Sequence, residues 1–144
     1  MECRPGESAH PGRLLNSSVG RSQTKTMADF IKSFGFALKG IVWVLRTERN
    51  FKIQLACGIL AIILGAILEI SRVEFAIVIS ISVLVLSLEL ANTAMEKYLD
   101  KYHPEKDDTV GLVKDIFAGA VLLASIGAAV IGALIFIDPL IEKV

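Results

Sequence analysis

Three long apolar stretches constrain the fold of this chain more than any other feature of its sequence. Segment 116–137 has no charged residue, segment 75–95 has Glu89 as its only charge, and segment 53–68 has none. A helix needs about 20 mostly apolar residues to cross the hydrocarbon core of a bilayer, and each stretch reaches that length together with its flanking residues. The sequence therefore predicts an all-α membrane protein with spans at about 52–70, 73–99 and 113–137.

The composition also indicates a membrane protein. Hydrophobic residues make up 53% of the 144 residues and the mean hydropathy is +0.61, and both values are high for a soluble domain of this size. The 15 basic and 15 acidic residues balance, so net charge gives no argument for a nucleic-acid partner. The length is that of one domain.

Residues 1–26 differ from the rest of the chain. They are rich in Gly, Ser, Pro and Arg and lack the apolar core of a signal peptide. We expect a disordered tail there, or an extension upstream of a start at Met27. The membrane domain is expected at 27–144.

A helix lying along the membrane surface is predicted at 28–46. Its apolar residues share one face, and basic residues recur every seven residues on the other. The apolar face holds Phe30, Ile31, Phe34, Leu38, Ile41 and Leu45, and the basic face holds Lys32, Lys39 and Arg46. Opposed apolar and basic faces are typical of a helix in the interface plane.

Basic residues near the ends of the predicted spans indicate the orientation in the membrane. Lysines and arginines are frequent before the first span and in loop 97–115, whereas the turn at 69–74 has only Arg72. Cytoplasmic loops carry the excess of Lys and Arg. The N-terminus and loop 97–115 are therefore predicted on the cytoplasmic side of the cell membrane, and the C-terminus outside.

Polar residues recur at helical spacing inside the second span, in the run LELANTAMEKYLD at 88–100. Glu89, Asn92, Glu96 and Asp100 fall within about 80° of one another around the helix axis, at about 100° per residue. A carboxylate within a span is costly, so it normally faces a site or a partner. This stripe is the candidate functional site.

Further charged residues are predicted at the same membrane surface: Glu48 before the first span, and Lys114 and Asp115 at the start of the third. Mg²⁺ prefers a few carboxylates together with phosphate oxygens and waters. Phosphoryl transfer also needs a group that accepts the proton of the nucleophile. These residues predict a magnesium–nucleotide site, held by helix side chains because the chain has no GxxxxGK[ST] loop. Glu89 lies about 10 Å deeper than Glu96 along the helix, where it meets the polar head of a lipid as the candidate base.

At these residues the chain resembles the small prokaryotic diacylglycerol kinase and undecaprenol kinase family. The run Glu89-x-x-Asn92-Thr93-Ala94-Met95-Glu96-x-x-x-Asp100 is similar to the signature of that family. Further similarity follows at Lys32-Ser33-Phe34, Lys39-Gly40, Glu48-Arg49-Asn50-Phe51, Lys114-Asp115 and Ala118-Gly119-Ala120-Val121-Leu122. The resemblance covers about residues 28–137, in the same order.

The resemblance implies a homotrimer whose protomers each have an amphipathic surface helix and three spans, with active sites shared between neighbouring protomers. It also implies ATP and a divalent metal such as Mg²⁺, with Glu89 as the catalytic base and with Glu48 and Glu96 as metal ligands. The residues that it assigns to ATP are Phe36, Glu48, Asn92, Glu96, Glu105, Lys114 and Asp115, with Asp100 in a supporting role.

Three places depart from the family pattern. Asp29 stands where members often carry an arginine that contacts ATP or lipid. Phe36 stands where some members carry an aromatic hydroxyl, so its ring can stack but not donate a hydrogen bond. In the loop, Asp107 and Asp108 replace a His-Pro pair. Two acids beside a polyphosphate either weaken its binding or assist the metal.

The sequence thus predicts an ATP- and Mg²⁺-dependent lipid kinase that transfers the γ-phosphate to the hydroxyl of a membrane lipid alcohol, either diacylglycerol or undecaprenol. Two other classes stay open. Buried Glu and Asn in a helical oligomer also suit a small ion- or proton-coupled transport subunit. Small residues four apart in the third span suit a non-catalytic membrane scaffold; they are Ala120, Ala124, Ala128 and Gly132.

Overall fold

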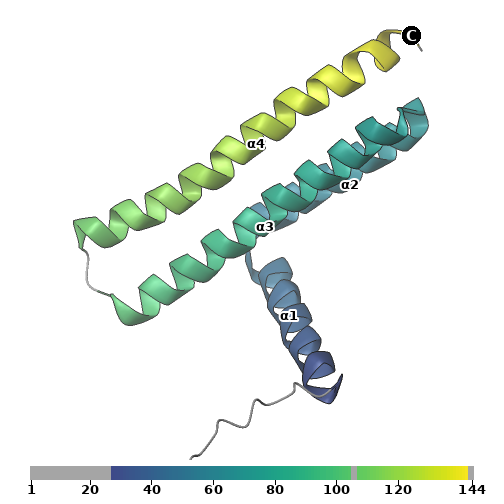
Figure 1. The fold of residues 1–144 in the computed structure, drawn as a ribbon. Coiled ribbons are helices and arrows are strands. Elements are labelled where there is room, and N and C mark those ends of the chain that lie inside the picture. The colour runs from purple at the N-terminus through teal and green to yellow at the C-terminus, as the bar shows by residue number, and fades with distance from the viewer. Residues whose placement is uncertain (1–26, 105–106, 143–144) are drawn as a thin grey trace, which may run out of the picture.

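The computed structural model describes residues 27–104 and 107–142, and these residues form four helices and no strand (Figure 1). The helices are α1 at Met27–Thr47, α2 at Arg49–Leu68, α3 at Arg72–Tyr102 and α4 at Asp108–Glu142. Helices α2, α3 and α4 are each long and apolar enough to cross a membrane. The predicted all-α membrane protein with an N-terminal helix and three spans is confirmed. The tail predicted at 1–26 lies outside the described residues.

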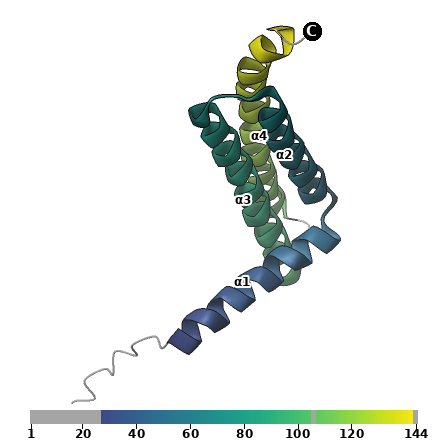
Figure 2. The same cartoon turned by 90° about the vertical axis from the view of Figure 1, so that its right-hand side faces the viewer.

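Helices α2, α3 and α4 form a bundle, and α1 leaves it at an angle (Figures 1 and 2). Helix α3 packs against both α2 and α4, which contact each other less. The end of α3 and the start of α4 lie at the same end of the bundle, and the α2–α3 turn and the C-terminus lie at the other (Figure 1). Because α3 is longer than α2, its last turns extend past the α1–α2 junction. This arrangement places Glu89, the first residue of the stripe, against α2 near that junction.

The interior of the single chain is small. Its buried apolar side chains are Val44, Phe51, Leu68, Val78, Val85, Leu99, Val121 and Ile135. Most other apolar side chains of the bundle are exposed or half-buried. On α1, Phe30, Ile31 and Phe34 are likewise exposed. Such an apolar exterior fits a protein whose outer surface meets lipid or other protein chains.

A tight turn joins α2 to α3. Glu69 adopts the left-handed backbone conformation with φ 55°, and the N–H groups of Glu69 and Ile70 both donate to the carbonyl oxygen of Gly65. A Cβ atom at Gly65 would lie 2.8 Å from Ile70 Cδ1, so glycine permits the close approach. The Ser71 hydroxyl then accepts from the Glu74 N–H, and the Glu74 carboxylate accepts from the Ser71 N–H. This capping box starts α3 and directs it back along α2.

Candidate active site

Glu89 is a buried carboxylate on α3. Only 4% of the residue is exposed, and Gln54 Nε2 on α2 donates a hydrogen bond of 3.3 Å to Glu89 Oε2. Thr93, one turn further along α3, is also buried. The negative charges of Glu48 and Glu96 both repel the carboxylate of Glu89. The fold therefore gathers three of the predicted carboxylates into one region of the bundle.

Glu48 lies at the junction of α1 and α2. It is the residue before the first turn of α2, in extended conformation, and its side chain is 24% exposed. Glu48 Oε1 lies 3.3 Å from Lys97 Nζ on α3, and the same ammonium lies 6.0 Å from the centroid of the Trp43 ring on α1. Lys97 therefore holds the α1–α2 junction against α3.

Asp100 and Lys114 connect α3 to α4. Lys114 Nζ donates a hydrogen bond to Asp100 Oδ1, and the two groups form an ion pair. The negative charge of Glu96 also attracts the ammonium group of Lys114. A lysine from the third span is thus brought next to the stripe on the second.

The remaining predicted site residues lie in different surroundings. Asn92 and Glu96 are half-buried on α3, and Asp115 is exposed at the start of α4. Phe36 is 68% exposed and lies 5.6 Å from Lys39 Nζ, measured from its ring centroid. It belongs to the N-terminal half of α1, which Figure 2 shows leading away from the bundle. Glu105 lies outside the described residues.

The acidic groups of this region are of the kind that binds divalent metal ions in nucleotide sites. Within 27–104 and 107–142, no group of three or more His, Cys, Asp or Glu residues is arranged to hold a metal ion. Glu48 and Glu96 offer two carboxylates, and Mg²⁺ in nucleotide sites commonly takes one or two carboxylates and completes its shell with phosphate oxygens and waters. The donor set therefore suits Mg²⁺ bound together with a polyphosphate.

Asp107 has a structural task in this fold. Its Oδ1 accepts a hydrogen bond of 2.6 Å from the Thr109 N–H, so it caps the first turn of α4. The hydrogen bond from the Thr109 backbone holds the pKa of Asp107 below its ordinary value. Helix capping is a role for this acid that the sequence prediction did not consider.

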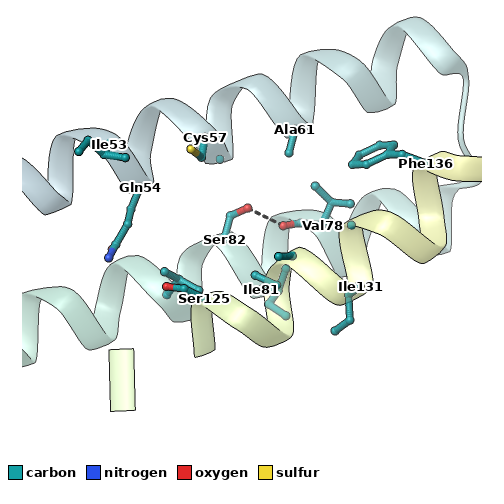
Figure 3. Close-up of a pocket in the computed structure, with 15 residues that line it drawn as sticks. Ile53, Gln54, Cys57, Ala61, Val78, Ile81, Ser82, Ser125, Ile131 and Phe136 are labelled. Carbon is teal, nitrogen blue, oxygen red and sulfur yellow. Dashed lines mark hydrogen bonds between the residues drawn. The ribbon is translucent and has the colours of Figure 1, made fainter. Parts of the chain in front are cut away.

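An apolar cavity of about 460 Å³ lies between α2, α3 and α4 (Figure 3). Gln54 lies toward one end and Phe136 toward the other, with Ser82 on α3 between them. The Ser82 hydroxyl donates a hydrogen bond of 2.7 Å to the Val78 carbonyl of its own helix. Its O–H is therefore not available as a donor to the cavity. The polar end of the cavity is the end where Gln54 lies.

Two residues of this region were missed by sequence reasoning. Gln54 is the amide inside the otherwise apolar stretch 53–68, which is a signal that could have drawn attention to it. Lys97 follows Glu96 in the stripe segment and reads as an ordinary basic residue at a span end. Its contact with Glu48 depends on how α1 and α3 meet, so the sequence gives no direct sign of it.

Comparison with known proteins identifies the family. Residues 35–136 match the family described as prokaryotic diacylglycerol kinase. The chain belongs to that family. The predicted resemblance is therefore confirmed, and the chain is placed among membrane lipid kinases.

Proteins similar to this member of the prokaryotic diacylglycerol kinase family carry the names diacylglycerol kinase and undecaprenol kinase. The chain is 34% identical to a diacylglycerol kinase of Synechocystis over 119 residues, which cover 79% of this chain and 66% of the relative, slightly less than two thirds. It is 38% identical to an undecaprenol kinase of Bacillus subtilis over 115 residues, 77% of this chain and 90% of the relative. It is 28% identical to a diacylglycerol kinase of Escherichia coli, over 76% of this chain and 89% of the relative.

Proposed function

We propose that this protein is an ATP- and Mg²⁺-dependent kinase of the cell membrane that phosphorylates the hydroxyl of a membrane lipid alcohol. The observation that carries the proposal is the position of Glu89. Its buried carboxylate accepts a hydrogen bond from Gln54 and is repelled by the charges of Glu48 and Glu96. The chain belongs to a lipid kinase family. A carboxylate in this position is suited to remove the proton from a hydroxyl that approaches from the bilayer.

The proposed reaction has one proton transfer and one phosphoryl transfer. Glu89 accepts the hydroxyl proton of the lipid as the hydroxyl oxygen attacks the γ-phosphorus, the bond between that phosphorus and the β–γ bridging oxygen breaks, and ADP leaves. In this proposal Glu48 and Glu96 hold Mg²⁺, which neutralises phosphate charge when bound. Lys114, Asp115, Asn92, Phe36 and Glu105 contact the nucleotide, and Asp100 orients Lys114.

The substrate is proposed as a class, a lipid with a single free hydroxyl at the membrane surface. Relatives at 34% and 38% identity carry the names diacylglycerol kinase and undecaprenol kinase. Both alcohols offer the same reacting group, so the chemistry of Glu89 does not separate them.

We further propose that residues 27–144 form the membrane domain, with the N-terminus and the loop between α3 and α4 on the cytoplasmic side and the C-terminus outside. The excess of basic residues near these segments supports that orientation. ATP is then available on the side where Glu48, Glu96 and Lys114 are proposed to act. A homotrimer with shared active sites is proposed by similarity to the family.

The experiment that tests the function is phosphate transfer from labelled ATP in detergent with Mg²⁺, to diacylglycerol and to undecaprenol in parallel. We expect labelled product with at least one lipid. Glu89→Gln should fold and lose about 10²- to 10⁴-fold in turnover, the range for removing a general base.

A matched control is Glu74→Gln, which makes the same change on α3 at the opposite end of the bundle and keeps an acceptor for the Ser71 N–H. It should retain wild-type turnover. Full activity of Glu89→Gln would exclude Glu89 as the base. Failure of well-folded wild-type protein to label any lipid alcohol would contradict the proposed function.

A further inference from the structure

Gln54 is a polar side chain that lines the cavity between α2, α3 and α4, and the proposed reaction does not yet use it. It lies on α2 and donates through Nε2 to Glu89 Oε2 on α3, 35 residues away in sequence. The orientation of the amide follows from the chemistry of the carboxylate, because an ionised carboxylate only accepts hydrogen bonds and the amide must turn its N–H toward it.

The carbonyl oxygen of the same amide is buried. Within residues 27–104 and 107–142, Gln54 Oε1 accepts no hydrogen bond. A buried acceptor without a partner lowers stability, because no hydrogen bond compensates for its lost contact with water. The hydrogen bond to Glu89 accounts for the N–H side of the amide, whereas the unsatisfied oxygen on its other side calls for an explanation of its own.

The hydrogen-bonding capacity of an amide matches both states of a carboxyl base. While Glu89 is ionised, the Nε2–H donates to it. Once Glu89 has taken a proton, it becomes a donor as well, and the unpartnered Oε1 of Gln54 is a free acceptor on the same amide for that O–H. The amide then makes one more hydrogen bond after proton transfer than before it. Interactions gained along the reaction accelerate it, whereas equal interactions throughout do not.

We propose that Gln54 is the positioning residue for Glu89: its Nε2–H fixes the ionised carboxylate, and its Oε1 accepts a hydrogen bond from the carboxyl O–H once Glu89 has taken the proton of the lipid hydroxyl. This inference rests on the function proposed above. The contact joins two helices of the bundle, so it also fixes the carboxylate relative to a rigid scaffold.

The test compares Gln54→Met, which has similar length and no hydrogen bond, with wild type in the lipid phosphorylation assay. We expect kcat to fall about 10- to 100-fold, since a small misplacement of a reacting group has effects of that size. KM for Mg-ATP should stay unchanged, because the groups proposed to hold the nucleotide are not altered. Gln54→His keeps a ring N–H donor and should recover part of the lost kcat.

Ser82→Ala is the matched control. It changes another polar side chain of the same cavity, whose hydroxyl is bonded within its own helix, and it should leave kcat unchanged. All variants are compared on the fraction that elutes like the wild-type oligomer. If Gln54→Met does not fold, Gln54→His and Gln54→Asn take its place. The histidine side chain is longer than that of asparagine, so Gln54→His should have the higher kcat. Equal kcat values of the two variants would overturn the inference.

The outcomes also separate this inference from the proposed function. Active wild-type protein together with an equally active Gln54→Met removes the positioning role and leaves the lipid kinase proposal intact. A rise in KM for Mg-ATP with unchanged kcat assigns Gln54 to nucleotide binding and likewise overturns the inference. Wild-type protein that labels no lipid alcohol contradicts the function itself.

Discussion

Individual charged residues in this protein are held in place by partners from other helices. Glu89 accepts a hydrogen bond from Gln54, and Glu48 forms an ion pair with Lys97 at 3.3 Å. The Glu48–Lys97 pair is partly exposed, with 47% of the lysine side chain accessible, so its net contribution is that of a surface ion pair, about 0.2–1 kcal/mol. A pair of this strength can hold Glu48 in place and still release it to a divalent cation.

If Glu48 binds Mg²⁺ as proposed, removing Lys97 should make its carboxylate easier for the ion to reach. We expect Lys97→Met to lower the Mg²⁺ concentration for half-maximal activity by up to about fivefold, the factor that corresponds to 1 kcal/mol. A Mg²⁺ titration at saturating ATP measures this. Lys101→Met, which removes a cation over the Tyr102 ring, serves as the control. A higher Mg²⁺ requirement would assign Lys97 to the nucleotide instead.

At the scale of the helices, the two ends of the bundle have different tasks. The α2–α3 turn is closed by the Gly65 carbonyl and the Ser71 capping box. The other end holds the Asp100–Lys114 pair and the α4 cap at Asp107. Changes at the first end should therefore affect stability. If Lys114 binds the nucleotide as proposed, changes in the Asp100–Lys114 pair should affect KM for ATP.

Replacing the N-cap of α3 tests the first part of this division. Ser71→Ala should lower the free energy of unfolding by about 1 kcal/mol, because it removes the hydroxyl that accepts from the Glu74 N–H. Turnover of the folded protein should not change. Denaturation in detergent measures the stability, and Ser71→Thr, which keeps a capping hydroxyl, should restore it. Lost turnover at unchanged stability would contradict this separation.

The Asp100–Lys114 pair tests the second part. If Lys114 binds nucleotide, Lys114→Met should raise KM for ATP several-fold, whereas Asp100→Asn should have a smaller effect, because it leaves the lysine in place. Steady-state kinetics and unfolding of both variants and of the double variant separate the two roles. Equal effects of the two single variants on stability, with no change in KM, would leave Lys114 a purely structural role.

Most apolar residues of the whole molecule are not buried between its own helices. Only eight apolar residues within 27–104 and 107–142 are buried, although three helices have the length and composition of spans. The rest of that surface is available to lipid and to neighbouring copies. The exposed apolar residues of α1 extend it beyond the bundle.

A homotrimer is the expected assembly. Analytical ultracentrifugation in density-matched detergent should give the mass of three chains of 15.6 kDa. Dilution in detergent that separates the chains should abolish turnover, because the family resemblance implies active sites shared between protomers. A monomer with full turnover would contradict shared active sites.

The spans and the stripe could be predicted from the sequence because both follow from local rules. Hydrophobic length fixes which segments can cross a membrane, and helical periodicity fixes that Glu89, Asn92 and Glu96 share a face. The turn at 69–74 was likewise visible as a short charged break between apolar stretches. These features need no knowledge of how one helix lies against another.

The partners of the charged residues were decided by the tertiary structure. Gln54 and Glu89 are 35 residues apart, and Lys97 contacts the α1–α2 junction across the bundle. No periodicity within one helix relates such residues, because their distance depends on the packing of two rigid helices and on the turn between them. The sequence alone therefore determined a membrane protein with a polar stripe, and the packing of the helices determined which side chains hold that stripe in place.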